Sequence, residues 1–179
     1  MRKNIIFISG IHGVGKTTFA KSMSKKYGIE YYSSSELISN NCNKKFDSKL
    51  TNEIDENQNQ LLNAVEKLLN KKKIYFLDGH FCLLDKKLYI KRIPLGTYMN
   101  LGIKAIILLV DSVENINNRL NYRDNRNYEL DLISEFQKQE LNYANEIASM
   151  LDVPIICIDI GKCDIDNHLR VEELIQEYV

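Results

Sequence analysis

The segment GIHGVGKT at residues 10–17 matches the pattern G-x-x-x-x-G-K-[S/T] at every fixed position. An apolar, largely β-branched run precedes it at residues 5–8, as expected for a buried strand. Residues 17–26 follow without Gly or Pro and place their apolar side chains on one helical face. Strand, glycine-rich loop and helix form the arrangement that holds the phosphates of a nucleoside triphosphate. The sequence therefore predicts a nucleotide site at this loop.

Each residue type in the loop has a physical task. Glycines allow backbone angles and close approaches that a Cβ would block, so successive N–H groups can point at phosphate oxygens. Lys16 is expected to reach the β- and γ-phosphates, and the Thr17 hydroxyl to coordinate Mg²⁺. His12 occupies an unspecified position, where loop packing alone accounts for it. The expected ATP-binding residues here are Gly10, His12, Gly13, Val14, Gly15, Lys16, Thr17 and Thr18.

Composition limits the classes of partner. The 179 residues suffice for one domain, which we expect to span residues 1–179. The formal net charge is zero, so nothing global attracts the chain to nucleic acid or an anionic membrane. The four cysteines form no CxxC pair and, with the three histidines, no recognisable metal spacing. Scattered thiols and the lack of a long apolar run lead us to expect a cytoplasmic protein.

Strand and helix patterns alternate along the chain. Strand patterns occupy residues 5–8, 29–33, 74–77, 103–110 and 153–160, and a small hairpin is expected over 81–84 and 88–93. Helical patterns occupy 16–26, a short segment beginning near 35, and 51–71, 112–121, 130–151 and 166–178. This alternation predicts an α/β fold of three layers, α/β/α, in which a parallel sheet of five strands has helices on both faces. Ligands of such sheets bind at the carboxyl ends of the strands, where the glycine loop lies.

A second acidic position follows the strand at 74–77. Asp78 ends this apolar strand, as in the Walker B motif, where the carboxylate holds Mg²⁺ directly or through water. The alternative is a carboxylate that caps a turn with Gly79. His80 lies at the same strand end and could position a water or an acceptor hydroxyl, or serve only as a structural hydrogen-bonding group.

Three of the six arginines fall within eight residues. Arg119, Arg123 and Arg126 have spacings that place them near one helical face. A guanidinium binds phosphate oxygens in two places and stabilises the charge that spreads over a transferring phosphoryl group. The alternative is a solvated helix end paired with acidic neighbours such as Asp124 and Glu129. We expect Arg119 and Arg123 to be catalytic and Arg119 and Arg126 to contact the nucleotide.

Taken together, these segments resemble adenylate kinase and its relatives over nearly the whole chain. The likeness rests on the loop GIHGVGKTT, the segment SSSELI at 33–38, the strand end Asp78-Gly79-His80 and the pair Arg119 and Arg123. The resemblance implies a parallel five-stranded sheet, a mobile lid near residues 119–130 and an acceptor-binding region near 34–71. It further implies that the lid arginines contact phosphates when the lid closes.

The chain departs from this family on the acceptor side. Typical adenylate kinases have an arginine for the acceptor phosphate at the position of Ser39, and another at the position of Cys82. The Asp-x-His arrangement is closer to the divergent adenylate-kinase-like ATPases of the CINAP type. Lys44, Lys45 and Arg92 are candidate substitutes that nothing in the sequence selects.

The sequence thus favours an ATP- and Mg²⁺-dependent phosphotransferase that acts on a nucleoside monophosphate or another small molecule. Lys16, Asp78, His80 and the lid arginines form the expected catalytic set. One alternative is an ATPase switch or assembly factor that acts on a protein partner. A polynucleotide kinase is a minor alternative, because no basic stripe with stacking aromatics is evident. A GTP switch is disfavoured because the guanine signature Asn-Lys-x-Asp is absent.

Overall fold

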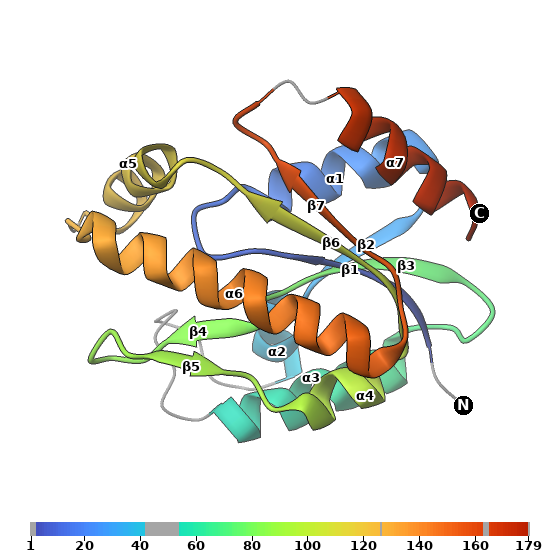
Figure 1. Cartoon of the computed structure of the whole chain (residues 1–179). Helices are drawn as coiled ribbons and strands as arrows, with labels where there is room; N and C mark the ends of the chain where they lie inside the picture. The colour runs from blue at the N-terminus through green and yellow to red at the C-terminus, as the bar shows by residue number, and fades with distance from the viewer. Residues whose placement is uncertain (1–2, 42–53, 126, 163–164, 179) are drawn as a thin grey trace.

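A parallel sheet runs through the middle of the molecule in the computed structural model, with helices above and below it (Figure 1). The strands stand in the order β2-β3-β1-β6-β7. Their bounds are β1 Asn4–Ser9, β2 Glu30–Ser33, β3 Ile74–Asp78, β6 Ile103–Val110 and β7 Ile155–Asp159. The predicted five-stranded parallel sheet is confirmed.

The structure describes residues 3–41, 54–125, 127–162 and 165–178. Among these residues no helix combines the length and the apolar character needed to cross a bilayer. Arg126, Lys44 and Lys45, which the sequence singled out, lie outside the described residues.

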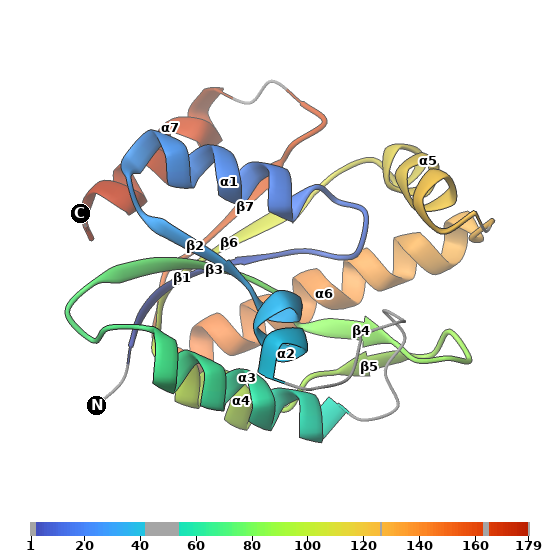
Figure 2. The same cartoon turned by 180° about the vertical axis from the view of Figure 1, so that it is seen from behind.

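Helices cover both faces of the sheet. On one face lie α1 (Lys16–Tyr27) and α7 (Ile165–Gln176), and on the other α3 (Ile54–Leu68), α4 (Leu95–Leu101) and α6 (Leu130–Leu151), as Figures 1 and 2 show from opposite sides. Both faces of the central strands are therefore buried, which explains why β1 and β6 are apolar at nearly every position.

Shorter elements gather around the carboxyl ends of the strands. Helix α2 (Ser34–Asn41) directly follows β2, and α5 (Val113–Asp124) follows β6. The expected hairpin forms from β4 (Cys82–Leu84) and β5 (Ile90–Arg92), which pair antiparallel. Asp85 closes its turn by accepting the backbone N–H groups of Lys87 and Tyr89 at 2.8 and 2.9 Å.

Helix α4 has no counterpart among the predicted elements. It begins after Pro94, spans only seven residues and contains Gly96, so local propensity gives little sign of it. Its formation is explained by packing, because Thr97, Tyr98 and Leu101 are buried.

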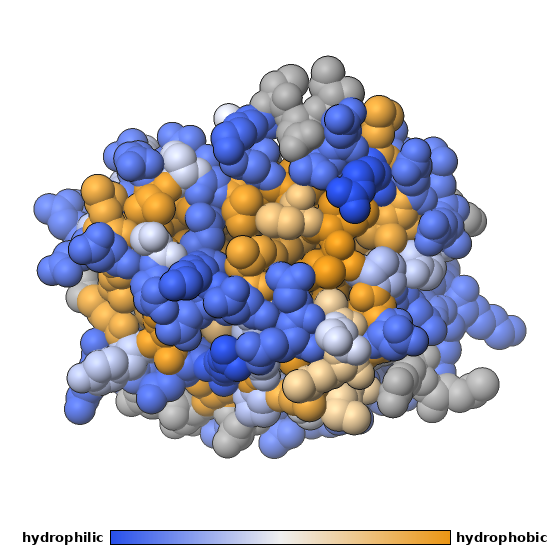
Figure 3. Space-filling model, viewed as in Figure 1, coloured by the Kyte–Doolittle hydropathy of each residue, from blue (hydrophilic) through white to orange (hydrophobic). Residues whose placement is uncertain are grey.

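The visible face of the molecule has an apolar centre. Figure 3 shows hydrophobic side chains gathered where the edge strand β7 runs between α6 and α7, with hydrophilic residues around them. Ile155 and Cys157 of this strand are partly exposed. The active-site residues described below lie elsewhere, at the carboxyl ends of β1 and β3 and around the hairpin.

Candidate active site

The phosphate loop connects β1 to α1 as the motif predicts. Gly15 stands at the N-terminus of α1 with φ of 107°, a conformation that side chains rarely tolerate. At the start of the loop, a Cβ on Gly10 would come within 2.6 Å of the Leu109 carbonyl oxygen of β6. The loop is thus fixed by glycines against the neighbouring strand, and its end opens into a helix N-terminus that favours anions.

Lys16 is the first residue of α1 and its side chain lies over the loop. Its Nζ donates to the carbonyl oxygens of Gly10 at 2.6 Å and Ile11 at 2.9 Å. The residue is only 8% exposed, so its charge acts in a partly desolvated setting where electrostatic interactions are strong. The ammonium therefore stands where a bound phosphate tail would meet it.

Thr17 and Asp78 come together, as the sequence predicts. β1 and β3 are neighbours, and Ile8 pairs with Asp78 in the parallel register. The Thr17 hydroxyl donates to Asp78 Oδ2 at 3.2 Å, and the carboxylate is buried. Two oxygen ligands of the kind that Mg²⁺ prefers thus face each other beside the phosphate loop.

Tyr31 is a site residue that the sequence did not reveal. Its hydroxyl donates to the same Asp78 oxygen at 2.6 Å, from the adjacent strand β2. Burial, followed by the hydrogen bond to Asp78, raises the pKa of Tyr31, so the phenol stays protonated and keeps donating. A tyrosine in a strand carries no motif, and only the pairing of β2 with β3 places it here.

His80 lies between the phosphate loop and the hairpin. Its Nε2 is 2.9 Å from Lys16 Nζ, and its ring centroid is 4.1 Å from that of His12. Because an ammonium can only donate, a hydrogen bond between the two requires this Nε2 to accept, which the tautomer protonated on Nδ1 allows. The expected proximity of His80 to the phosphate loop is therefore seen, and His12 also has a neighbour in the site.

Arg119, one of the arginines expected in a lid, contacts the phosphate loop. Its Nη1 donates to the Val14 carbonyl at 3.2 Å, and Nη2 pairs with Asp111 at the end of β6. Its Nε donates to Asn115 one turn back in α5. Asp111 is buried and also accepts the Ser112 backbone N–H, so it fixes the guanidinium beside the phosphate loop. Asp111 was not predicted from the sequence.

Arg123, a second arginine expected in the lid, has its ion pair away from the phosphate loop. Arg123 forms an ion pair with Asp124, the adjacent residue of α5, which agrees with the alternative of a paired helix end. Arg126 lies outside the described residues. The roles assigned to these two arginines stay predictions.

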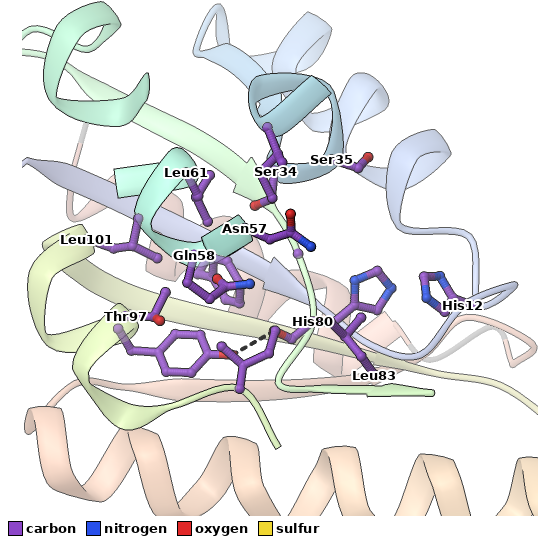
Figure 4. Close-up of a pocket in the computed structure, with 15 residues that line it drawn as sticks. His12, Ser34, Ser35, Asn57, Gln58, Leu61, His80, Leu83, Thr97 and Leu101 are labelled. Carbon is purple, nitrogen blue, oxygen red and sulfur yellow. Dashed lines mark hydrogen bonds between the residues drawn. The ribbon is translucent and has the colours of Figure 1, made fainter. Parts of the chain in front are cut away.

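A pocket opens on the other side of His80 (Figure 4). It has a volume of about 90 Å³ and lies between α2, α3, α4 and the strand end at Gly79. Its lining residues are Phe7, His12, Ser34, Ser35, Ile38, Asn57, Gln58, Leu61, Gly79, His80, Leu83, Ile93, Thr97, Tyr98 and Leu101. This is the region expected to receive the acceptor, with α4 as an unpredicted wall.

The described lining of this pocket carries no lysine, arginine or carboxylate. Its polar groups are amides, hydroxyls and imidazoles, and the buried Ser34 hydroxyl has no hydrogen-bond partner among the described residues. Arg92, one suggested substitute for the missing acceptor arginines, does not line it. Arg92 instead pairs with Glu146 and lies over the Tyr143 ring, 4.6 Å from its centroid.

Glu140 of α6 is a buried carboxylate that sequence reasoning missed. Its side chain is 1% exposed and accepts backbone N–H groups from both halves of the site, those of Gly10, Phe81 and Cys82. Burial raises the pKa of Glu140 to about 7, against the opposing effect of these hydrogen bonds and of Lys16. In the sequence it sits in the polar stretch QKQE of a long helix, which gives no sign of burial.

The glycine loop, the acid-ended strand β3 and the parallel sheet define a P-loop nucleotide-binding protein. A family model described as "AAA domain" matches residues 9–137, which include the loop, most of the pocket lining and α5. The chain belongs to this family.

One curated relative is similar over part of the chain. A Pyrococcus abyssi (strain GE5 / Orsay) protein described as "Putative adenylate kinase" is 39% identical over 77 residues. The match covers 42% of this chain and 40% of the relative, so the chain spans well under half of that protein. The description of this relative agrees with the resemblance to adenylate kinase inferred from the sequence. The likeness to CINAP-type ATPases is not confirmed.

Solved structures share the fold over the full chain. The shikimate kinase of Acinetobacter baumannii, solved with shikimate, has a TM-score of 0.60 at 14% identity, covering 100% of this chain and 96% of its own. A gluconokinase of Sinorhizobium meliloti 1021 has a TM-score of 0.51 at 13% identity and covers 100% of both chains. At this identity the likeness establishes the architecture alone.

Proposed function

We propose that this protein is an ATP-dependent kinase that transfers the γ-phosphoryl group to a small molecule held in the pocket beside His80. The observation that carries the proposal is the 2.9 Å contact between Lys16 Nζ and His80 Nε2. It joins the phosphate loop to the wall of the pocket, so a phosphoryl group bound by Lys16 would face a molecule bound beside His80. The curated relative and the kinases of similar fold support this reading.

We assign Mg²⁺ to Thr17 and Asp78. Their oxygens are 3.2 Å apart. A hydroxyl and a carboxylate oxygen are ligands of the kind that Mg²⁺ prefers, so these two residues would hold the ion beside the phosphate loop. When bound there, the ion would neutralise negative charge on the nucleotide phosphates. Tyr31 would hold the Asp78 carboxylate in the required orientation.

The protein's own groups then divide the work of transfer. Lys16 and the loop N–H groups bind the phosphates, and Arg119 supplies positive charge from the α5 side of the loop. Once Lys16 turns to phosphate, His80 Nε2 is available to accept the proton of the attacking hydroxyl. Attack on the γ-phosphorus forms the new P–O bond as the bond to ADP breaks. Arg123 and Arg126 would join when the lid closes.

The pocket suggests the chemistry of the acceptor. Apolar walls with the amides of Asn57 and Gln58 suit a largely neutral molecule that offers hydrogen-bonding groups along one edge. A nucleoside monophosphate would require a cation, and the candidates for that role are Lys44 and Lys45, outside the described residues. We therefore favour a neutral hydroxyl compound, with a nucleoside monophosphate as the competing acceptor.

The decisive experiment follows transfer of radiolabelled γ-phosphate from ATP to nucleosides, nucleoside monophosphates and polyols. We expect a neutral acceptor to be labelled, with a KM that the double variant Lys44→Ala/Lys45→Ala leaves within about twofold. A monophosphate whose KM rises tenfold or more in this variant would reverse our choice of acceptor. ATP turnover that no acceptor stimulates would contradict the kinase itself.

The second candidate is an ATPase that acts on a protein partner. The observation that favours it is the described pocket lining without charge, next to a histidine able to orient water. Under this alternative, water replaces the acceptor and hydrolysis depends on His80. Hydrolysis that survives His80→Ala unchanged would remove the role of this histidine. A cytoplasmic location, where ATP is plentiful and thiols stay reduced, suits either function.

A further inference from the structure

Glu140 connects segments that are distant in sequence. Oε1 accepts the Gly10 N–H at 3.2 Å and the Phe81 N–H at 2.9 Å, and Oε2 accepts the Cys82 N–H at 2.6 Å. These donors belong to the start of the phosphate loop and to the start of the acceptor-side hairpin, 130 and about 60 residues away. A single carboxylate on the middle of α6 thus bonds to both halves of the site.

We infer that Glu140 is a positioning residue that fixes the hairpin to the phosphate loop and so sets His80 against Lys16. The expected effect on turnover rests on the proposed kinase function, whereas the link between the hairpin and the phosphate loop does not. The backbone at residue 80 is held on two sides. The Tyr98 hydroxyl donates to the His80 carbonyl at 2.7 Å, and Glu140 accepts from the next residue, Phe81.

The negative charge of Glu140 matters because every partner is a donor. An ionised carboxylate accepts several N–H groups, whereas a glutamine has one oxygen and turns an N–H₂ toward the remaining donors. Burying a charge is costly unless hydrogen bonds compensate. The three backbone N–H groups that Glu140 accepts therefore offset part of the cost of burying its carboxylate. Titratable groups that bear on Glu140 are Lys16 from α1, Cys82 from β4 and Tyr98 from α4.

The first test separates binding from turnover in Glu140→Gln. We expect the dissociation constant for a non-hydrolysable ATP analogue to stay within about threefold, because Lys16 and the inner loop amides remain. Turnover should fall tenfold or more, because His80 is no longer fixed. The matched control is Glu135→Gln, the same change at an exposed position of α6, which should alter neither quantity. Equal loss of binding and turnover in Glu140→Gln would overturn the inference.

The second test needs no catalysis. Backbone hydrogen exchange is measured across residues 80–84 with and without the ATP analogue. In the wild type, nucleotide binding at the loop should increase protection of the hairpin, and in Glu140→Gln this increase should vanish while the loop stays protected. A nucleotide-induced increase in hairpin protection that persists in Glu140→Gln would overturn the inferred coupling. Absence of turnover in the wild type, by contrast, would contradict only the proposed kinase activity.

The third test uses pH. Burial raises the pKa of Glu140 to about 7, so acid should weaken its hydrogen bonds near neutral pH. Groups other than Glu140, including the histidine proposed as base, act alike in the wild type and in Glu140→Gln, so their contributions cancel in a ratio. For a single titration of Glu140, the ratio of wild-type to Glu140→Gln turnover should therefore fall about tenfold from pH 8 to pH 6, and Glu135→Gln should follow the wild type. A decline of equal depth in Glu140→Gln would assign the titration to another group and count against the inference.

Should Glu140→Gln fail to fold, the wild type alone still supplies a test. Protonation then replaces the substitution, and the ligand-induced change in hairpin exchange is compared at pH 8 and pH 5.5. The increase in protection should be present at pH 8 and lost at pH 5.5. An equal increase at both values would contradict the proposed role of the Glu140 charge.

Discussion

Among single residues, Lys16 gives the most direct test of the proposed phosphate site. Lys16→Met keeps a side chain of similar length while removing the charge that faces the phosphates, so turnover should fall at least about 100-fold. The midpoint of thermal unfolding should change little, because the ammonium donates to the loop carbonyls of Gly10 and Ile11 and lies beside the His80 imidazole, at the edge of the apolar core. Steady-state kinetics with a melting curve check this prediction. A variant that retains a tenth of the wild-type turnover would contradict it.

Tyr31 gives a sharper prediction because its neighbour is a natural control. Tyr31→Phe removes the hydroxyl that orients Asp78, and we expect the apparent affinity for Mg²⁺ to weaken about tenfold. Tyr32→Phe removes a hydroxyl whose partner within the described part of the chain is the exposed Glu30, so it should leave that affinity unchanged. Titration of activity with Mg²⁺ distinguishes the two. Equal effects would show that Asp78 does not depend on Tyr31.

Sequence reasoning singled out residues that carry a motif and passed over residues that carry none. Lys16, Thr17, Asp78 and His80 were found because their spacing is fixed by local backbone geometry. Tyr31 and Glu140 act through strand pairing and helix packing between segments far apart in sequence, as their contacts show. A tyrosine in a strand and a glutamate in a polar helical turn look ordinary until the fold is known.

Among the helices and strands, α5 offers the clearest test, because it positions Arg119. Arg119 bonds to Asp111 and to the Val14 and Asn115 carbonyls through three separate guanidinium nitrogens, whereas a lysine offers a single nitrogen in place of this planar fork. Arg119→Lys should therefore lower turnover tenfold or more, even though the positive charge is kept. Arg170→Lys, on an exposed position of α7, is the control and should have no effect. Kinetics at saturating ATP measure both.

The elements themselves were largely foreseeable. The five strands and the long helices were predicted within a few residues, because continuous apolar runs and helical periodicity survive in the sequence. Helix α4 was not foreseeable, since two turns containing Gly96 have little intrinsic stability and form because Tyr98 and Leu101 fill the core. The pocket wall that α4 supplies was missed for the same reason.

At the scale of the whole molecule, Glu140 links stability to pH. Its folded-state pKa of about 7 exceeds the ordinary value of 4.5, so between these values the folded protein holds a proton that the unfolded chain has released. The free energy of unfolding contributed by this group therefore falls as pH rises from about 4.5 to 7, and is constant on either side.

Urea denaturation measures this linkage. The unfolding free energy of the wild type minus that of Glu140→Gln should be smaller at pH 8 than at pH 5, because the variant has no such proton and the other carboxylates cancel in the difference. A difference that is unchanged or larger at pH 8 would show that Glu140 is ionised over the whole range.

The hairpin also contains a built-in chemical reporter. Cys82, at the start of β4, is fully buried, and burial together with the Glu140 charge raises the pKa of its thiol to about 12. A thiol in this state resists alkylation, since the thiolate is the reactive form. The rate at which Cys82 is alkylated, followed by mass spectrometry, would therefore report how often the hairpin separates from α6. The native chain thus offers a way to measure opening of the hairpin beside the pocket without any introduced label.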